Sequence, residues 1–535
     1  MFIPKCWNRE NHDSFGAARR PHTTGYRRRR QHNAAPCCRF QHTQGYQSIG
    51  SFHSDDMGVL MSMTEEEYSP PPLPFEPRAY NNNFSPDSRI AHSPNASDFM
   101  LDRKEWTFLN HGAFGASLKV GYDRAEQWRW YLEQQPLRYF DRALLPHLAY
   151  ATRRLANFRT PLNSATSSDA DLQQIRQGLT LIQNATSGLN SIMRGFAREY
   201  GSSARVVIWD TSYGTVKKLA SHIFGSDRVM EIPFQQKYLP QFSSVATLSP
   251  SPGNPNQIFL EALTETFQTL QPWKEGHKVL LVLDHTTSNT AMTMPIMEIA
   301  QFAKQEYGDQ VQVLVDGAHG LLAQKVDLQA FSPFIDYYVS NGHKWLSCPR
   351  GVGMLYCSQP DLRNTVLAEP AIISHGVDEP DLLSRFVWDG CRDYGAALAL
   401  PAVLDFWEAC GQANVMGQMK AALLGGIQIL TDHWHGGCPR HSWLDERVVI
   451  VPVDLLSPMA LVRLPDGLCG HAKEPKNSQD AKKIQDFLFD QRIEVPIKCI
   501  NGALFVRVSA HVYNEPRDFD HLGKTLANIS SMDCF

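Results

Sequence analysis

The sequence predicts an α/β fold: a large, mainly parallel mixed sheet flanked by helices, followed by a smaller α+β C-terminal domain. Two observations predict it. From about residue 100, short runs rich in β-branched residues alternate with longer amphipathic stretches, a pattern typical of strands and helices that follow one another in a parallel sheet. After about residue 385 the order changes to a helix, short strands and a further helix.

The strands of the predicted sheet are the runs that are apolar throughout, because strands covered on both faces carry few polar residues. Helices are expected where apolar residues recur at three- and four-residue spacing. We expect strands at 204–210, 278–284, 311–316, 336–340 and 351–357, and helices at 256–270 and 296–306. Ligands of such sheets lie beyond the carboxyl ends of the strands, so the residues that follow each run are candidates for a functional site.

Residues 1–97 differ from the rest of the 535-residue chain. They combine an arginine run at 27–30, an acidic patch at 65–67 and a proline run at 70–72, and they carry too little apolar surface to form a core. We expect a disordered, basic and proline-rich arm at 1–97, a large domain at 98–385 and a small domain at 386–535.

The net charge of −4 hides an asymmetry. Residues 1–54 contain nine Lys and Arg residues against two acids, so they carry +7 and the remainder carries −11. A nucleic-acid partner is therefore not expected for the folded part. The arginine-rich, acid-poor start is similar to an organellar transit peptide, and the alternatives are a solvated basic tail or a start of translation at Met57, Met61 or Met63.

No run approaches the roughly 18 apolar residues of a membrane span, and the first thirty residues lack the apolar core of a secretory signal. We expect a protein that is neither secreted nor in the membrane. Its compartment would be the cytoplasm or, if the arm is a transit peptide, a mitochondrion or plastid. The eleven cysteines form no CxxC pair, so we expect free thiols and no metal site.

Acidic, imidazole and amine side chains follow two neighbouring predicted strands. Asp316 ends one strand and His319 follows it, while Asn341, His343 and Lys344 follow the next. Because the carboxyl ends of parallel strands meet at one edge of a sheet, we expect these side chains in one crevice. An amine among apolar neighbours has a lowered pKa and acts as a nucleophile, as Schiff-base chemistry requires. A carboxylate opposite it suits the pyridinium nitrogen of pyridoxal 5′-phosphate.

The segment NATSGLN lies between a short apolar run and an amphipathic helix. Its Thr186 and Ser187 place hydroxyls and free amides at a helix N-terminus, where phosphate binds well. Each candidate also has a structural explanation: Asp316 as a helix cap, His319 as a core histidine and Lys344 as a solvated lysine. The order of phosphate loop, Asp-x-x-His and His-Lys, each at a strand end, favours the functional interpretation.

A resemblance to a known family rests on three segments, NATSGLN, DGAHG and SNGHKWLSCPRGVG. They are similar to the cofactor motifs of the class V aminotransferases, pyridoxal-phosphate enzymes of fold type I. Four further segments resemble the branch of isopenicillin N epimerases, cysteine desulfhydrases and sulfoxide C–S lyases: WTFLNHGAFGA, QQPLRYFDR, WDGCRDYGAALALPAVLDF and FVRVSAHVYNEPRDFDHL. The resemblance spans about residues 100–530 and implies the fold-type-I architecture, pyridoxal 5′-phosphate as cofactor and a homodimer that completes its sites across the two-fold axis.

The resemblance implies a role for each matching residue. Lys344 would carry the cofactor as a Schiff base and move the Cα proton, Asp316 would hold the ring nitrogen protonated, and Arg507 would bind the substrate carboxylate. Arg138 would reach the site from the partner chain. The implied cofactor contacts are Thr186, Ser187, Tyr213, Ser288, Asp316, His319, Asn341, His343 and Lys344, and the implied substrate contacts are Asn110, His111, Arg138 and Arg507.

Some of these residues keep a structural alternative beside the implied role. Tyr213 could be an ordinary aromatic at the sheet edge, and Arg507 could be the partner of a structural ion pair. Asn110 and His111 could belong to a turn that caps a helix.

Two positions depart from the family pattern. Cys391 stands where relatives carry a threonine whose hydroxyl reaches the phosphate of the neighbouring subunit, and a thiol is a weaker donor. Desulfurases need a cysteine on a mobile loop before the substrate arginine, whereas Cys499 lies in a β-like run close to Arg507. We therefore expect no desulfuration through a cysteine persulfide.

We expect an enzyme that uses pyridoxal 5′-phosphate and acts at the Cα of an amino-acid substrate. β-Elimination at a C–S bond ranks first, epimerisation second and transamination third, and all share removal of the Cα proton by Lys344. An alternative of another class is a non-catalytic scaffold that uses the basic arm for interaction. A metal hydrolase built on Asp316, His319 and His343 lacks further ligands at usable spacing.

Overall fold

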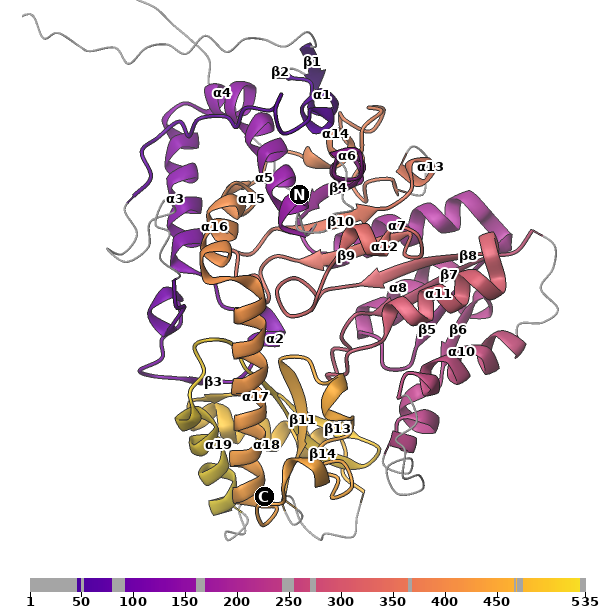
Figure 1. Ribbon diagram of the computed structural model, residues 1–535, viewed down its shortest axis with the longest axis vertical. Helices are drawn as coiled ribbons and strands as arrows, with labels where there is room; N and C mark the ends of the chain where they lie inside the picture. Colours follow the sequence, from indigo (N-terminus) through magenta and orange to yellow (C-terminus); the bar gives the residue numbers. More distant parts are fainter. Residues whose placement is uncertain are drawn as a thin grey trace, which may run out of the picture. The chain divides into compact units, whose positions relative to one another are not determined.

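The computed structural model of the protein describes residues 46–49, 52–78, 92–159, 169–242, 255–269, 276–363, 368–465, 468 and 475–529 (Figure 1). Residues 44–535 make one compact unit. The arginine run at 27–30, on which the expected targeting role rests, lies outside the described residues. Within the described part, no helix is both long and apolar enough to cross a membrane.

The largest sheet has seven strands in the order β4-β10-β9-β8-β7-β5-β6. Its strands are β4 (Leu179–Ile182), β5 (Ala204–Trp209), β6 (Val229–Ile232), β7 (Lys278–Asp284), β8 (Val311–Asp316), β9 (Tyr337–Asn341) and β10 (Gly353–Cys357). Every neighbouring pair is parallel except the two that β10 makes with β4 and β9. The prediction of a large, mainly parallel mixed sheet is confirmed, and β4 and β6 at its two edges are strands that the sequence did not single out.

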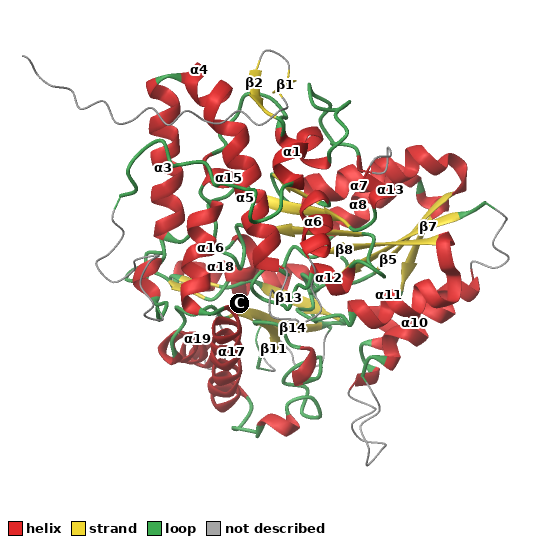
Figure 2. Cartoon of the chain, turned by 45° about the horizontal axis from the view of Figure 1, so that its top comes forward, coloured by secondary structure: helices red, strands yellow, loops and turns green. Residues whose placement is uncertain are grey.

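Helices cover both faces of this sheet (Figure 2). Successive residues of a strand point to opposite faces, so each strand supplies two cores. α7 (Ala185–Tyr200) and α8 (Gly214–Phe224) share one core with alternate residues of β5, β7 and β8. α5 (Leu144–Arg159), α10 (Gln257–Thr269) and α11 (Ile296–Tyr307) share the other core with the intervening residues. α10 and α11 are the helices expected at 256–270 and 296–306.

A second, antiparallel sheet of three strands carries the C-terminal part of the chain. Its order is β11-β14-β13, and it packs with three helices, which is the smaller α+β part that the sequence predicts. The elements are β11 (Met459–Arg463), β13 (Ile497–Ile500), β14 (Ala503–Ser509), α17 (Gln412–Trp434), α18 (Ser478–Asp490) and α19 (Pro516–Ile529).

A short N-terminal stretch joins this C-terminal part to the large sheet. β3 (Thr107–Phe108) pairs in parallel with β12 (Ile493–Glu494), and α2 (His111–Phe114) follows it. Gly115, at φ +68°, ends α2 where an added Cβ would lie 1.9 Å from the backbone oxygen of His343. Glycine therefore allows α2 to approach the turn that carries Lys344.

α1 (Met57–Ser62) differs from the disordered arm expected over 1–97. Met57 and Met61 are 0% and 2% exposed and belong to the main core. The Arg153 guanidinium donates to two backbone oxygens at the end of α1. Methionines four residues apart give the segment an apolar helical face. Composition alone does not indicate this helix, because many acids and prolines follow it. The stretches 1–45 and 79–91 of the expected arm lie outside the described residues.

Candidate active site

A cavity of about 440 Å³ opens at the carboxyl ends of β7, β8 and β9, where the sequence predicts the site. Of the nine expected cofactor contacts, all but Ser187 line it. The lining residues are Ala113, Phe114, Asn184, Ala185, Thr186, Leu189, Tyr213, Asp284, Thr286, Ser288, Asp316, Ala318, His319, Asn341, His343 and Lys344.

Lys344 lies in the turn after β9, next to a histidine whose tautomer is fixed. The indole N–H of Trp345 donates to Nδ1 of His319 at 3.2 Å. Because Nδ1 accepts this bond, the neutral imidazole carries its proton on Nε2. Nε2 lies 3.2 Å from Nζ of Lys344. His319 therefore donates to the lysine nitrogen, a bond that a neutral amine accepts and an ammonium does not.

The electrostatics of the cavity favour the same proton state. Burial lowers the pKa of Lys344 from 10.5 to about 8, against the opposing effect of the Asp316 carboxylate, and the Arg507 guanidinium lowers it further. Burial and the charge of Lys344 hold the pKa of His319 well below its ordinary value. At slightly alkaline pH, Lys344 is therefore largely an uncharged amine, the nucleophilic form.

Asp316 has an acidic neighbour that the sequence interpretation missed. β7 and β8 pair so that Asp284 lies opposite Asp316, and both residues line the cavity. Asp316 accepts the backbone N–H of Ala318 at 2.9 Å, and Asp284 accepts the hydroxyl of Ser212 at 2.7 Å. Burial raises the pKa of both carboxyls, and the charge of Asp316 helps to bring the pKa of Asp284 to about 8. The sequence held a signal for this pair, since both strands end in aspartate.

The N-terminus of α7 reaches the cavity through a capping box. The Asn184 side chain accepts the N–H of Ser187 at 3.0 Å, and the Ser187 hydroxyl donates to the Asn184 backbone oxygen at 2.7 Å. Ser187 therefore completes the helix cap and does not line the cavity, unlike the other expected cofactor contacts. Oδ1 of Asn341 accepts the N–H of Ala185 at 2.9 Å and ties the helix start to the end of β9.

Donors remain free for an anion beside this helix start. Thr186 is exposed at the cavity, in the first turn of the 16-residue α7. Nδ1 of His343 is buried and has no hydrogen-bond partner within the part of the chain that the structure describes. Burial lowers the pKa of His343 to about 4, so the ring is neutral and its N–H is available as a donor. A buried nitrogen without a partner next to a helix N-terminus fits a phosphate group.

Arg507 of β14 is a buried guanidinium held from two sides. It donates to the backbone oxygen of Ser288 at 2.5 Å and to Oδ1 of Asn110 at 3.2 Å, and Asn110 in turn donates to Glu494 at 2.9 Å. Its Nε has no partner, and no described carboxylate forms an ion pair with it. Burial lowers the pKa of Arg507 to about 10. A buried guanidinium in this setting can bind a carboxylate.

None of the four expected substrate contacts lines the cavity: Arg507 and Asn110 adjoin it through Ser288, while His111 and Arg138 lie elsewhere. His111 is fully buried, with Nδ1 at 2.9 Å from the Tyr513 hydroxyl and Nε2 at 3.0 Å from the backbone oxygen of Lys344. His111 therefore supports the Lys344 turn and does not face the cavity. Arg138 stacks on Tyr131, 4.3 Å from the ring centre, and lines a different hollow of its own chain.

The two cysteines that depart from the family pattern also lie outside the lining. Cys391 is exposed, in the loop after Gly390. Cys499 lies within β13, and its thiol donates to the backbone oxygen of Lys476 at 3.1 Å. The expectation that Cys499 belongs to a β-strand is confirmed.

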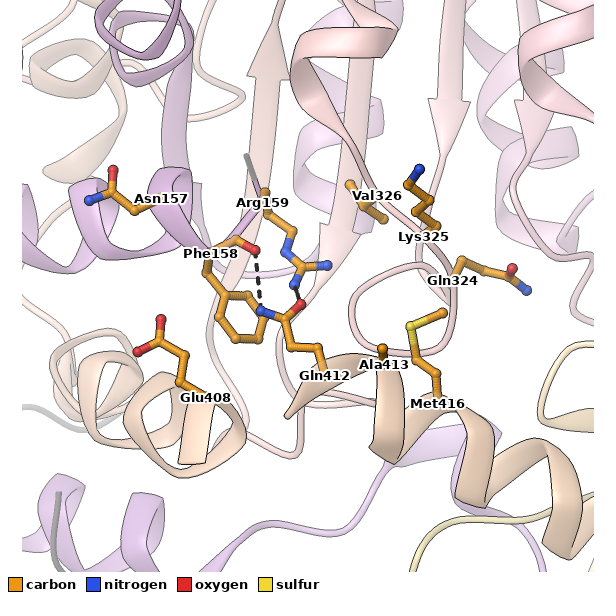
Figure 3. A pocket seen from close by; sticks show the side chains of 10 residues that line it. All are labelled: Asn157, Phe158, Arg159, Gln324, Lys325, Val326, Glu408, Gln412, Ala413 and Met416. Atoms are coloured by element: carbon orange, nitrogen blue, oxygen red, sulfur yellow. Dashed lines mark hydrogen bonds between the residues drawn. The ribbon is translucent and has the colours of Figure 1, made fainter. Parts of the chain in front are cut away.

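A second cavity, of about 560 Å³, contains none of the predicted residues (Figure 3). It lies between the end of α5, the turn at 324–326 and the junction of α16 (Leu400–Cys410) with α17. Although it is the larger of the two, it combines apolar side chains with Arg159, Lys325 and Glu408, and it holds none of the histidines or strand-end aspartates of the first cavity.

Comparisons with known proteins show which proteins this chain is similar to. The model of the class V aminotransferases matches residues 263–418. An L-cysteine desulfhydrase of Arabidopsis thaliana is 25% identical over 450 residues, which are 79% of this chain and 87% of that protein. An isopenicillin N epimerase of Amycolatopsis lactamdurans is 24% identical over 443 residues, 79% of this chain and 95% of that protein.

Solved structures share the fold. A cystine C–S lyase in complex with cysteine persulfide has a TM-score of 0.54 at 18% identity and covers 79% of this chain and 97% of its own. A cysteine desulfurase of Thermococcus onnurineus NA1 has a TM-score of 0.55 at 15% identity and covers 80% and 95%. At these identities the likeness shows the fold alone. With the sequence relatives and the site geometry, it leads to one conclusion: the chain is similar to the class V aminotransferases in sequence, fold and site.

Proposed function

We propose that this chain is a pyridoxal-phosphate-dependent enzyme that acts at the Cα of an amino acid, and that its reaction is β-elimination at a C–S bond. The observation that carries the proposal is the state of Lys344, an amine of pKa about 8 that accepts a hydrogen bond from His319 in a cavity shared with Asp316. The L-cysteine desulfhydrase among the relatives supports the choice of reaction.

The residues of the cavity fit the cofactor. Lys344 supplies the amine for its aldehyde, and Asp316 supplies a carboxylate for its ring nitrogen. Thr186, the first amides of α7 and the unpartnered His343 nitrogen suit its phosphate. Tyr213, 47% exposed at the cavity, offers a ring face for stacking. When bound, pyridoxal 5′-phosphate draws electrons away from the Cα of an attached amino acid.

Lys344 would act as the base at Cα. A catalytic base works best when its pKa is close to the working pH, and burial is the main reason why the pKa of this lysine falls to about 8. The bond from Nε2 of His319 fixes the direction of the amine lone pair. Trp345 keeps that bond in place, since its indole N–H occupies the other imidazole nitrogen.

Arg507 would bind the α-carboxylate of the substrate. The guanidinium is buried and held by Ser288 and Asn110, but no described carboxylate neutralises it. A planar guanidinium forms two parallel hydrogen bonds with a carboxylate, which fixes the orientation of the amino acid as well as its affinity. These properties support an α-amino acid as the substrate class.

The position of the cysteines supports elimination over desulfuration through a persulfide. None of the cavity-lining residues is a cysteine, and Cys499 is fixed within β13. Since the described lining offers no thiol to take sulfur from the substrate, we expect the sulfur to leave as a free thiol or sulfide. Epimerisation is the second candidate, because the isopenicillin N epimerase of A. lactamdurans aligns with 79% of this chain.

The test supplies the purified full chain with pyridoxal 5′-phosphate and L-cysteine and measures sulfide and pyruvate. We expect equal amounts of both, and Lys344→Ala should lower kcat by about 10² to 10⁴. Lys218→Ala, at an exposed position of α8, is the matched control and should keep full activity. A racemised amino acid without sulfide would favour epimerisation. Absence of both cofactor binding and turnover would favour the non-catalytic scaffold.

We further propose that the chain works as a homodimer. Several large apolar side chains are exposed on one copy, among them Phe114 at the cavity and Trp130 and Leu137 beside Arg138, at 70%, 64% and 66%. Covering such groups is a common reason for self-association. Sedimentation equilibrium of the active enzyme should give twice the chain mass, and an active monomer would contradict the proposal.

The N-terminal residues are proposed to direct the chain to an organelle. One Arabidopsis thaliana relative, 25% identical over 458 residues, is named as chloroplastic. The structure gives the deletion to use: residues 1–45 are removed, so that α1, which belongs to the core, stays. If the deleted chain keeps its turnover but no longer reaches the organelle, the N-terminal residues act as a targeting sequence. Unchanged localisation would contradict the proposal.

A further inference from the structure

Asp284 occupies a position that the reaction proposed above does not yet explain. It ends β7 directly opposite Asp316, which ends β8, and both line the cavity. The two residues are 3% and 5% exposed. Neighbouring parallel strands place such side chains about 5 Å apart, so two buried carboxyls meet at the proposed position of the ring nitrogen.

The carboxyl of Asp284 also holds the loop that follows β5. It accepts the Ser212 hydroxyl at 2.7 Å and a hydrogen bond from the backbone of Tyr213. Tyr213 begins α8 and lines the cavity. Asp284 thus binds the loop of the proposed stacking residue on one side and lies opposite Asp316 on the other.

Two buried carboxylates this close do not both ionise near neutral pH. Asp316 is the better anion, because the Ala318 N–H and the charge of Lys344 lower its pKa against burial. The charged groups that face Asp284 are Asp316 on β8 and Lys217 on α8, and burial together with Asp316 outweighs Lys217 and brings its pKa to about 8.

We propose that Asp284 is a positioning residue for the cofactor that the proposed function requires: its neutral carboxyl holds Ser212 and Tyr213 and leaves Asp316 as the single anion of the pair. The neutral partner prevents a second negative charge from competing with the Asp316 carboxylate for Lys344 and the ring nitrogen. If both carboxylates were charged, their repulsion would favour uptake of a proton or a cation between them.

The first test needs no cofactor. A carboxyl whose pKa is raised on folding stabilises the chain at low pH, and this stabilisation is lost as the pH rises from about 4 to about 8. The melting temperature of the cofactor-free full chain should therefore fall over this window. Asp284→Asn should flatten the fall, while Asp445→Asn, at an exposed position, should leave it unchanged. Identical profiles for Asp284→Asn and wild type would overturn the proposal.

The second test separates positioning from charge. Asn keeps the size and neutrality of the protonated carboxyl, so Asp284→Asn should retain the affinity for pyridoxal 5′-phosphate within about threefold. Asp284→Ala frees the Ser212 loop and should weaken it by about tenfold. Equal losses in both variants would overturn the proposal, because Asp284 would then act as a carboxylate. If wild type binds no cofactor, the proposed function fails, and the stability profile still decides the role of Asp284.

A separate observation concerns the second cavity (Figure 3). Arg159 is 3% exposed, and only one of its terminal nitrogens has a partner, Oε1 of Gln412. Among the described residues, its Nε has no hydrogen-bond partner and no carboxylate forms an ion pair with it. Figure 3 shows the guanidinium directed into the cavity, where burial lowers the pKa of Arg159 to about 10. Burial disfavours this cation more strongly than the Glu408 and Asp327 carboxylates stabilise it, so a bound anion would stabilise it further.

Most of the exposed wall around this guanidinium is apolar, with Phe158, Val326, Ala413 and Met416 among the lining residues, and Lys325 and Glu408 also line the cavity. We infer that the cavity binds a small monocarboxylate on an apolar body, with the carboxylate at Arg159. A volume of about 560 Å³ lies within the range of small-molecule sites. An inorganic anion would use the cation and leave the apolar walls uncovered.

The probe is 4-phenylbutyrate, titrated into the full chain by calorimetry, with 4-phenylbutanamide and acetate as matched controls. We expect binding of the phenylbutyrate alone and its loss in Arg159→Met. This variant should also keep or raise the melting temperature without ligand, because it removes a charge that burial disfavours. Equal binding of the amide, or unchanged binding to Arg159→Met, would overturn the inference. So would a lower melting temperature of Arg159→Met together with no binding to wild type.

Discussion

The proton state of Lys344 depends on neighbours that the chain supplies from separate segments. Burial removes water from the amine, His319 donates to it, and Trp345 decides which imidazole nitrogen carries the proton. The sequence indicates Trp345 only as an apolar neighbour that lowers the pKa of the lysine. Its indole N–H also fixes the tautomer of His319. Because Nδ1 accepts this hydrogen bond, Nε2 must donate to Lys344.

Trp345→Phe should therefore raise the pKa of Lys344 above about 8. Without the indole N–H, His319 can move its proton to Nδ1 and accept a bond from the lysine ammonium, which stabilises the charged form. The measurement is the pH dependence of Lys344 labelling by an amine-reactive reagent in the cofactor-free chain, read by mass spectrometry. An unchanged midpoint in the variant would contradict the role given to Trp345.

Arg507→Met should lower kcat/KM for the amino acid by about 30-fold to 1000-fold, since the substrate carboxylate loses its buried partner. The same change removes a buried cation that no described carboxylate neutralises, so the free chain should lose little stability or gain some. Steady-state kinetics and urea unfolding measure the two effects. A large loss of stability with unchanged kcat/KM would show that Arg507 is structural.

Residues at strand ends could be predicted from the sequence, and residues with a supporting role could not. Lys344 and Asp316 follow runs whose continuous apolar character marks buried strands, and the structure places both at the cavity. The sequence does not reveal the role of Asp284, because only the strand register shows that it lies opposite Asp316. The sequence equally cannot tell that Ser187 completes a helix cap or that His111 binds a backbone oxygen.

At the scale of elements, the strands and helices that are most buried are the ones that the sequence predicts best. The central strands are buried on both faces and read as continuous apolar runs. β6, at the edge, mixes buried and exposed residues in only four positions and gives no such signal. α1 is a single short helix whose two buried methionines acquire a partner only when α5 and α6 (Asp169–Gln177) pack against it.

The start of α7 offers an element-scale test with an internal control. Asn184→Ala removes a capping box beside the cavity, and Asn477→Ala removes the same capping box from α18, which is not part of the cavity. Each should cost about 1 kcal/mol of stability. Only Asn184→Ala should weaken the binding of pyridoxal 5′-phosphate, because it loosens the amides that meet the phosphate. Equal cofactor affinity in both variants would remove α7 from the proposed phosphate site.

At the scale of the whole molecule, the site depends on long-range contacts between distant parts of the chain. Asn110 follows β3, Lys344 follows β9 and Arg507 lies on β14, and the pairing of β3 with β12 brings the first and last of these together. Periodicity and motif order give the elements but not this pairing, since parallel contacts over hundreds of residues leave no local pattern. The resemblance to a family supplied what local patterns lacked.

An occupant of the cavity should stabilise the whole unit, because it binds only the folded chain. Supplying the cofactor at about 100 times its dissociation constant should add about 2.7 kcal/mol, and removing it should lower the melting temperature accordingly. Differential scanning calorimetry of the loaded and cofactor-free chain measures this. The shift should be smaller in Lys344→Ala, and identical transitions with and without cofactor would contradict a site in this cavity.

The claim on which the account depends is that Lys344 holds the cofactor. The direct measurement treats the loaded full chain with sodium borohydride and locates the phosphopyridoxyl group by peptide mass spectrometry. The account predicts the group on the peptide that contains Lys344, in a yield that falls as the pH drops below about 8 during loading. A phosphopyridoxyl group on another lysine, or on none, would contradict it.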